Sequence, residues 1–252
     1  MITAARNATS CALALSLIAD GPAQAGELSA FSLNVTRHVL YHELAHALIR
    51  EFDLPVLANE EAMADSFAVL AVMELHRDDV EEIVLDRVRS WLYEDAQSDP
   101  STYNFRSEHD LDIRRAYQAA CLFYGLDPNS FRDAVGWLDF TTGQLADCSD
   151  TAPDQQEGWQ SIVYPKLLPD DGRSEKVTLS YGGSPLDSQV QASGVFEDFA
   201  AVVARFDWPE PVTILFAECR GGASWSRSTR TIRFCDSYLR RFIDQGIALG
   251  RP

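Results

Sequence analysis

Residues 35–52 read VTRHVLYHELAHALIREF, and their hydrophobic pattern decides the structure of this part of the chain. Apolar side chains recur at intervals of three and four residues, which is the period of an α-helix with one buried face. They are Val39, Leu40, Leu44, Ala47, Leu48 and Phe52. Asp53-Leu54-Pro55 ends the pattern, because the residue before a proline is disfavoured in the helical conformation. The stretch therefore predicts a helix that ends near Phe52.

A second helix is predicted directly after this loop. Asn59 is a favourable N-cap residue, and Glu60 and Glu61 suit the positively polarised first turn of a helix. Apolar residues then continue at helical spacing to about His76. Because only a short loop separates the two helices, they are expected to form a hairpin over residues 35–76.

The first of these helices contains the motif HExxH, spelled by His42-Glu43-Leu44-Ala45-His46. Two imidazoles four residues apart lie on one face of a helix, about 6 Å apart along its axis, and can bind one tetrahedral Zn²⁺. Glu43 lies on the adjoining face, where it can hold and deprotonate a metal-activated water. The motif therefore indicates a zinc site with His42 and His46 as ligands and Glu43 as the catalytic base.

A catalytic zinc site needs a third protein ligand and one open position. Glu61 is the candidate, because the loop 53–59 is long enough to bring the second helix beside His46. Asp65, one turn further along the same face, would accept the N–H of a ligand histidine and fix its orientation. Glu60 is expected to point about 100° away from Glu61 and to have no such partner. Two acidic residues in a first turn are also what an ordinary helix start contains.

His42 to His46 and Glu61-Ala62-Met63-Ala64-Asp65 together resemble the gluzincin pattern, HExxH plus ExxxD, of thermolysin-like peptidases. The chain is more closely similar to a bacterial family of exported metallopeptidase-like proteins. The motifs that carry this similarity are HELAHALIREFDLPVL (42–57), EEAMAD (60–65), SEHDLDIRRAYQAACLFYGLDP (107–128), Cys148 with Trp159, and a paired-cysteine strand unit (211–238). The resemblance implies a zinc site of His42, His46 and Glu61, with Glu43 as general base.

A peptidase also needs a donor for the oxyanion that develops on the scissile carbonyl. His109 is the first candidate, with Asp110 or Asp112 orienting its ring, and Tyr103 is the second. A histidine that merely caps a helix is an equally good interpretation of His109. Arg114 and Arg115 are expected to form salt bridges with these carboxylates, although they could instead bind a substrate carboxylate.

Hydrophobic spacing predicts further helices at 78–93, 111–124 and 129–137. Residues 141–194 are rich in Gly, Ser, Asp, Gln and Pro and predict a looser segment, with an amphipathic stretch at 157–168 and a strand-like run at 176–181. Residues 195–252 predict a helix near 195–206, strands at 211–219 and 230–235 that form a hairpin, and a final helix from about Tyr238. The hairpin could pack back beside His42 as the edge strand that pairs with an extended peptide.

These elements predict an α+β fold that is mostly α-helical. Its expected architecture is a zincin-like helical core with a small antiparallel sheet from the C-terminal region. The zinc helices (35–76), the helical region (78–140), the looser segment (141–194) and the C-terminal unit (195–252) are expected to form a single domain, residues 26–252.

Residues 1–25 have the pattern of a secretory signal peptide. Cys11 to Ala19 form a nine-residue apolar run, and Ala23-Gln24-Ala25 supplies the small-x-small pattern of a cleavage site. A buried N-terminal helix is the alternative, whereas a membrane span is excluded because it needs about 20 apolar residues. The chain is therefore predicted to be exported, either periplasmic or secreted, without a stable membrane anchor.

Four cysteines remain after residue 25, and an even number in an exported chain indicates disulfides. Of the three possible pairings, Cys121–Cys148 together with Cys219–Cys235 is favoured. Buried free thiols are the alternative, because sequence alone does not fix connectivity.

The 38 acidic and 21 basic side chains give a formal charge of -17, which argues against nucleic acid as a partner. The sequence thus favours a zinc-dependent peptide hydrolase that acts on a peptide or protein substrate. Two alternatives stay open: an exported, non-catalytic or vestigial zinc-binding module, and a zinc hydrolase of a non-peptide amide. The oligomeric state is not predicted.

Overall fold

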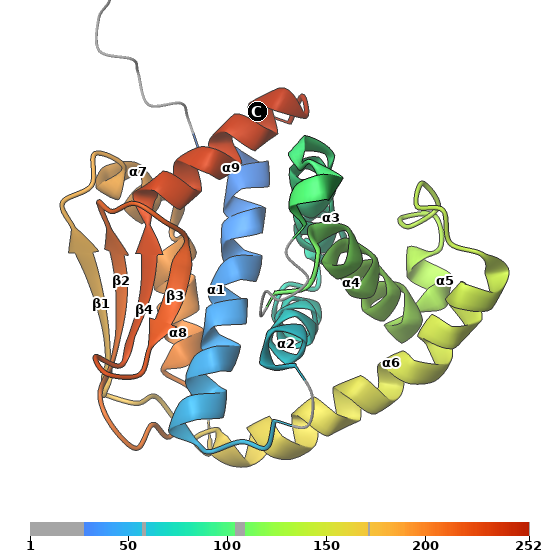
Figure 1. Ribbon diagram of the computed structural model, residues 1–252. Coiled ribbons are helices and arrows are strands. Elements are labelled where there is room, and N and C mark those ends of the chain that lie inside the picture. Colours follow the sequence, from blue (N-terminus) through green and yellow to red (C-terminus); the bar gives the residue numbers. More distant parts are fainter. Residues whose placement is uncertain (1–27, 57–58, 104–108, 171, 252) are drawn as a thin grey trace, which may run out of the picture.

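The computed structural model describes residues 28–56, 59–103, 109–170 and 172–251, and the predicted signal peptide lies outside these ranges. Helix α1 (Ala30–Glu51) runs through the centre of the molecule, between a group of helices and a small sheet (Figure 1). The hydroxyl of Ser29 accepts a hydrogen bond from the backbone N–H of Ser32, so α1 begins five residues before the predicted Val35. Because other elements cover α1 on several sides, most of its side chains are buried.

The helical group on one side of α1 confirms most of the predicted helices. Its members are α2 (Glu60–Leu75), α3 (Val80–Gln97), α4 (Asp112–Leu126) and α5 (Pro128–Phe131), with a short 3-10 helix η1 (Pro100–Thr102) after α3. The side chain of Asn59 caps α2, as predicted. The predicted helix 129–137 is wrong in extent, since α5 is a single turn that starts at a proline and continues as turns.

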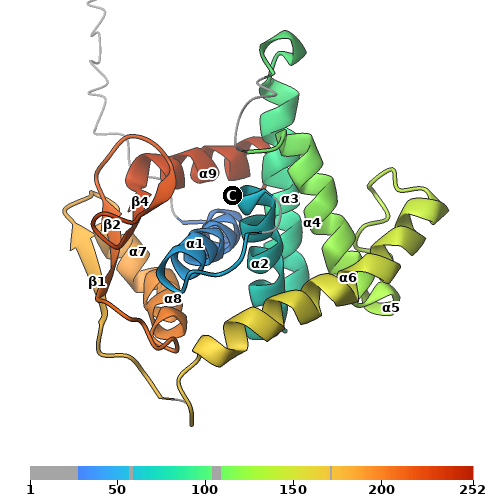
Figure 2. The same ribbon diagram turned by 60° about the horizontal axis from the view of Figure 1, so that its bottom comes forward.

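The predicted looser segment 141–194 is wrong in its first part. Residues Thr142–Val163 form the long helix α6, which packs against α4 and α2 and is followed by the 3-10 turn η2 (Tyr164–Lys166) (Figure 2). Thr141 and Gln144 form a reciprocal capping box that satisfies two orphan backbone N–H groups at its start. Its buried side chains are Cys148, Ala152, Trp159 and Val163, which share one face.

The sheet has four strands: β1 (Val177–Gly182), β2 (Val212–Ala217), β3 (Ala223–Ser226) and β4 (Thr231–Cys235), in the order β1-β2-β4-β3. Strands β1, β2 and β4 are mutually parallel where they pair, and only β3 is antiparallel to its neighbour β4. Helices α7 (Asp187–Ser193) and α8 (Val195–Val203) connect β1 to β2, and α8 contacts both β1 and α1.

The predicted hairpin between strands 211–219 and 230–235 is therefore wrong. The chain leaves β2, returns as the short edge strand β3, and only then enters β4. The overall class is confirmed, because the protein is mostly helical with a small sheet, but that sheet is mixed. Helix α9 (Asp236–Ala248) follows β4 directly and crosses one end of α1 to reach α3 (Figure 1). None of the described helices combines the length and apolar character needed to cross a membrane.

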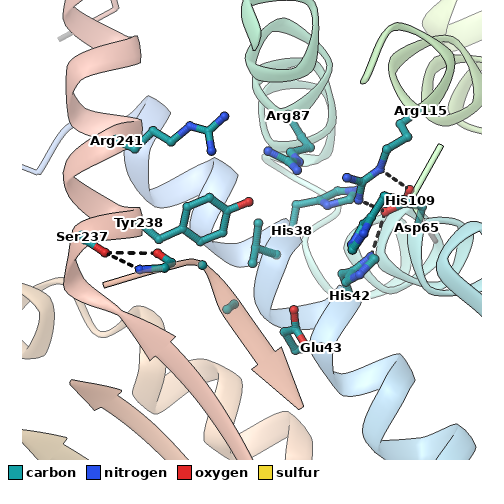
Figure 3. Close-up of a pocket in the computed structure, with 14 residues that line it drawn as sticks. His38, His42, Glu43, Asp65, Arg87, His109, Arg115, Ser237, Tyr238 and Arg241 are labelled. Atoms are coloured by element: carbon teal, nitrogen blue, oxygen red, sulfur yellow. Dashed lines mark hydrogen bonds and ion pairs between the residues drawn. The ribbon is translucent and has the colours of Figure 1, made fainter. Parts of the chain in front are cut away.

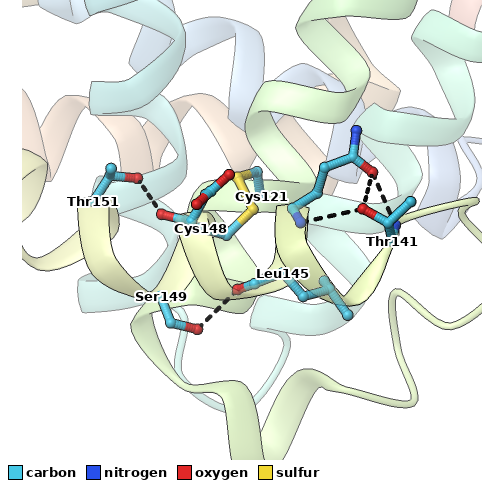
Figure 4. Close-up of a disulfide and its surroundings, with 8 residues drawn as sticks. Cys121, Thr141, Leu145, Cys148, Ser149 and Thr151 are labelled. Atoms are coloured by element: carbon cyan, nitrogen blue, oxygen red, sulfur yellow. Dashed lines mark hydrogen bonds between the residues drawn. A yellow bond between two sulfur atoms is a disulfide. The ribbon is translucent and has the colours of Figure 1, made fainter.

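Both predicted disulfides are present. Cys121–Cys148 joins α4 to α6 (Figure 4), and Cys219–Cys235 joins the segment after β2 to the end of β4. One turn after Cys121, Gly125 lies so close to α6 that a Cβ there would collide with the backbone carbonyl of Cys148. The disulfide and the glycine together fix how closely α4 and α6 approach.

Replacing Gly125 with Ala is therefore expected to lower the free energy of unfolding by about 1–3 kcal/mol, because the added methyl group overpacks the α4–α6 contact. Gly158→Ala is the matched control: Gly158 is exposed on α6 and a Cβ there meets nothing within 4 Å. That change should raise the free energy of unfolding by about 0.5–1 kcal/mol through helix propensity. Denaturant unfolding of both variants measures this, and equal effects at the two positions would contradict the close packing.

Candidate metal centre

The structure brings together the side chains that HExxH and the second helix were predicted to supply. The Nε2 atoms of His42 and His46 lie 3.1 Å apart on α1. Glu61, from the first turn of α2, faces both of them: its Oε2 is 3.2 Å from His42 Nε2 and its Oε1 is 3.5 Å from His46 Nε2. Two nitrogens and one carboxylate therefore converge on one point.

Carboxylates hold the opposite nitrogen of each ring. His42 Nδ1 lies 2.8 Å from Asp65 Oδ1, the arrangement predicted for Asp65. His46 Nδ1 lies 2.9 Å from Glu60 Oε1, so the expectation that Glu60 has no such partner is wrong. Because a carboxylate accepts the Nδ1–H of each ring, both Nε2 atoms are directed at the convergence point.

Arg115 secures Asp65 from α4. Its Nε and Nη2 donate to the two oxygens of Asp65 at 2.7 and 2.8 Å, while Asp112 is 3.9 Å from Nη1. Arg114 pairs with Asp110 at 3.3 Å, as the salt-bridge interpretation predicted. The main partner of Arg115 is thus not a neighbour on its own helix but the carboxylate that orients His42.

Glu43 faces away from these carboxylates, toward the sheet. It is buried, and it accepts a hydrogen bond from the backbone of Trp225 on β3. An edge strand therefore lies next to the HExxH helix, as predicted. The strand is β3 (Ala223–Ser226), however, and not part of the predicted hairpin. Burial raises the pKa of Glu43, and the nearby His42 and His46 only partly offset this effect.

His109 approaches the same point from the segment before α4. Its Nε2 lies 2.9 Å from Glu61 Oε2, and its ring stacks on that of His42 with centroids 6.3 Å apart (Figure 3). Within the described part of the chain, no hydrogen bond joins His109 to Asp110. Tyr103, the second candidate, donates its hydroxyl to Asp95 and lines neither of the cavities at the site.

Two cavities meet at this centre, and His42, Glu43, His109 and Ala223 line both. One, of about 600 Å³, extends along β3 past Ser224 and Trp225 and is called the strand cavity below. The other, of about 450 Å³, extends toward α3 and α9 and is lined by Arg87, Arg115 and Arg241; it is called the arginine cavity (Figure 3). The centre is therefore open to a ligand from two directions.

The carboxylates change the protonation of the histidines. Burial alone would lower the pKa of His42, but its hydrogen bond to Asp65 and the nearby Glu61 outweigh burial and raise this pKa to about 9. The pKa of His46 is also raised, despite its burial, by Glu61 and Glu60. For Glu61, the three surrounding imidazoles outweigh burial and hold its pKa well below the usual range.

The side chains present fit a bound metal ion. Ligand atoms of His42, Glu61 and His109 all lie within 4.8 Å of one another, and His46 adjoins them. Imidazole nitrogens and a carboxylate oxygen are the ligands that zinc prefers in catalytic sites. Glu61 Oε2 is buried beside His42 Nε2 and His109 Nε2, at 3.2 and 2.9 Å, so the atoms that would bind the metal are grouped around a single oxygen.

A family model described as "Putative metallopeptidase" matches residues 17–163, more than half of the chain. The chain belongs to this metallopeptidase family. The match covers the HExxH helix, α2 and His109, but it ends before the sheet and α9. Membership of the metallopeptidase family implies a metal and peptide hydrolysis. No curated protein and no solved structure matches the chain.

Sequence reasoning missed several residues of the metallopeptidase centre. Glu60 lies about 100° around α2 from Glu61. It therefore contacts a different atom of the same histidine: Glu60 meets Nδ1 of His46, whereas Glu61 lies beside Nε2. Arg87 carried a detectable signal, because it shares the buried face of α3 with Val84 and Trp91. Tyr238 and Arg241 carried none, since only the topology brings α9 to the centre.

Zinc binding to the metal-free protein at pH 7.5 is expected to release about one proton from His42, because a protonated imidazole cannot bind a metal. Apparent zinc affinity should therefore rise with pH until pH 9. Calorimetric titration in buffers of different ionisation enthalpy measures the release.

Asp65→Asn should lower both the proton release and, by roughly 10–100-fold, the zinc affinity, because an amide stabilises the imidazolium less. Asp154→Asn, an exposed position on α6, serves as the control. Negligible proton release by the unmodified protein at pH 7.5 would contradict the raised pKa of His42.

Proposed function

We propose that this metallopeptidase-family protein is a gluzincin-type, zinc-dependent peptide hydrolase. In this proposal His42, His46 and Glu61 bind zinc and Glu43 is the general base. The observation that carries the proposal is the convergence of both Nε2 atoms on Glu61 while carboxylates hold both Nδ1 atoms. In a helix pair without a metal site, three side chains able to bind a metal would not be expected to converge on one point.

Zinc bound at this point would polarise a substrate carbonyl and acidify a water molecule. Glu43 would take the proton of the attacking water and transfer it to the leaving amine. Its position supports this role, because it borders both cavities and is not required as a ligand. Its raised pKa also suits a group that must accept a proton and then give it up near neutral pH.

Strand β3 would align the substrate. One side of β3 pairs with β4. Just before β3, the carbonyl oxygen of Gly222 accepts a hydrogen bond from the backbone N–H of Cys235. Because backbone groups alternate along a strand, Ala223 and Trp225 face the opposite side, where Trp225 meets Glu43. The backbone of Ala223 is then placed to pair with an extended peptide, as in other cases of strand addition.

His109 would stabilise the developing oxyanion. Its side chain is half exposed and lines both cavities, and its Nε2 lies beside Glu61. Asp110 pairs with Arg114 in this structure, so an orienting role for Asp110 would require it to exchange partners when substrate binds.

The two disulfides support an exported protein, because disulfides persist mainly in oxidising compartments. We infer that the hydrolase acts on peptides or proteins in the periplasm or outside the cell. Its net negative charge favours neither nucleic acid nor an anionic membrane as a partner.

Glu43→Gln is expected to keep the fold and the bound zinc but to lose peptide hydrolysis, because the amide cannot accept the water's proton. His46→Ala should lose both zinc and hydrolysis. Metal analysis, circular dichroism and mass spectrometry of digested peptide mixtures check these outcomes. Glu81→Gln, exposed on α3, is the matched control, and hydrolysis by Glu43→Gln at the control's rate would end the proposal.

His109→Ala is expected to lower kcat by roughly 10²–10³-fold, which is typical for loss of one oxyanion donor. Zinc affinity should stay within a few-fold of the unmodified protein, since His42, His46 and Glu61 are retained. Parallel kinetic and metal-binding measurements test this, and loss of zinc from the variant would instead make His109 a ligand.

A further inference from the structure

The arginine cavity contains three arginines, and two of them already have carboxylate partners. Arg115 is bonded to Asp65 through two hydrogen bonds. Arg241 pairs with Glu94 at 2.9 Å. These two guanidinium charges are therefore largely neutralised within the protein.

Arg87 differs from both, because no carboxylate of the described residues lies within ion-pair distance of it. Its only hydrogen bond to a described residue runs from Nη1 to the hydroxyl of Ser90, at 3.2 Å. Its Nε is buried with no acceptor among the residues that the structure describes, and only 2% of the residue is exposed. Removing a cation from water without giving it a partner is strongly unfavourable.

The surroundings of Arg87 hold its guanidinium in one orientation. The group stacks over the Trp91 ring at 4.1 Å, and the hydroxyl of Ser90 in turn donates to Gln245 of α9. Figure 3 shows the guanidinium pointing into the cavity, between Arg241 and His38. The charge is thus fixed and directed at the same space that His42 and Glu43 border.

We propose that the arginine cavity is a subsite for a carboxylate of the substrate and that Arg87 binds it. The proposal rests on the peptide hydrolase function proposed above. Nη2 of Arg87 has no hydrogen bond to a described residue and, unlike Nε, is not among the buried atoms, so it can donate a charge-assisted hydrogen bond to one carboxylate in the cavity. The substrate carboxylate is either the C-terminus of a peptide or the side chain of Asp or Glu, close to the bond that is cleaved.

Two hydroxamate-terminated dipeptides that differ only in a C-terminal carboxylate or carboxamide test this subsite. Calorimetry on the zinc-loaded protein is expected to show the acid binding about 10–100-fold more tightly than the amide, as for one charge-assisted pair. A third hydroxamate, with a C-terminal amide and a Glu side chain, separates the two sources of the carboxylate. Equal affinity for all three would overturn the proposal.

Arg87→Met removes the charge and retains the length of the side chain. It should abolish the preference for the acid while leaving zinc affinity unchanged. Because it also removes an unpaired buried charge, the metal-free variant should melt at the same temperature as the unmodified protein or higher. Arg77→Met, an exposed arginine in the turn between α2 and α3 that lines neither cavity, is the matched control and should retain the preference.

The outcomes separate failure of this subsite from failure of the proposed function. If the hydroxamates bind without discrimination, or if Arg87→Met keeps the preference, the subsite is overturned and the zinc site stands. A melting temperature several degrees lower for Arg87→Met would also overturn it, by giving Arg87 a structural role. If no hydroxamate binds, the proposed open zinc site is wrong. The subsite is then tested without zinc, by comparing the affinities of N-acetyl-Ala-Ala as acid and as amide for the metal-free protein: tighter binding of the acid supports the subsite, and equal affinity overturns it.

Discussion

The carboxylate of Asp65 is the interaction on which the centre depends, because three helices share it. Asp65 belongs to α2, accepts the Nδ1–H of His42 on α1, and accepts two N–H groups of Arg115 on α4. All three side chains are largely buried. Without this carboxylate, an imidazole and a guanidinium would be left buried and unpaired. The same contact therefore holds α1, α2 and α4 together and orients His42, the first of the proposed metal ligands.

The position of α1 between helices and sheet separates the two tasks of the HExxH motif. His42 and His46 lie one turn apart and face α2, which supplies Glu61 and the two orienting carboxylates. Glu43, rotated by about 100° from His42, faces β3 instead. In the proposed function, the helical side binds the metal and the strand side aligns the substrate, and the cavities lie along the boundary between them.

Local patterns predicted the helical half well and the sheet poorly. Helical spacing, an N-cap and HExxH predicted α1, α2 and the approach of His42, His46 and Glu61 to one another, since each depends on residues close in sequence. The sheet depends on topology: a hairpin of 211–219 with 230–235 would put Cys219 and Cys235 at opposite ends, whereas parallel β2 and β4 bring their carboxyl ends together, as the Cys219–Cys235 disulfide requires. Helix α6 was missed because Gly143, Pro153 and Gly158 lower its intrinsic propensity. Its capping box and buried face against α4 outweigh that loss.

The net charge of this protein disfavours anionic ligands, whereas the local charge in the arginine cavity favours one. A formal charge of -17 describes the field far from the surface, where salt screens it within about 10 Å. Among the arginines that line the arginine cavity, Arg115 is bonded to Asp65 and Arg241 to Glu94, whereas Arg87 has no carboxylate partner among the described residues. An acidic protein can therefore disfavour polyanions at a distance and still select a single carboxylate at its centre. The buried face of α3, with Arg87 between Val84 and Trp91, is where that selectivity is encoded.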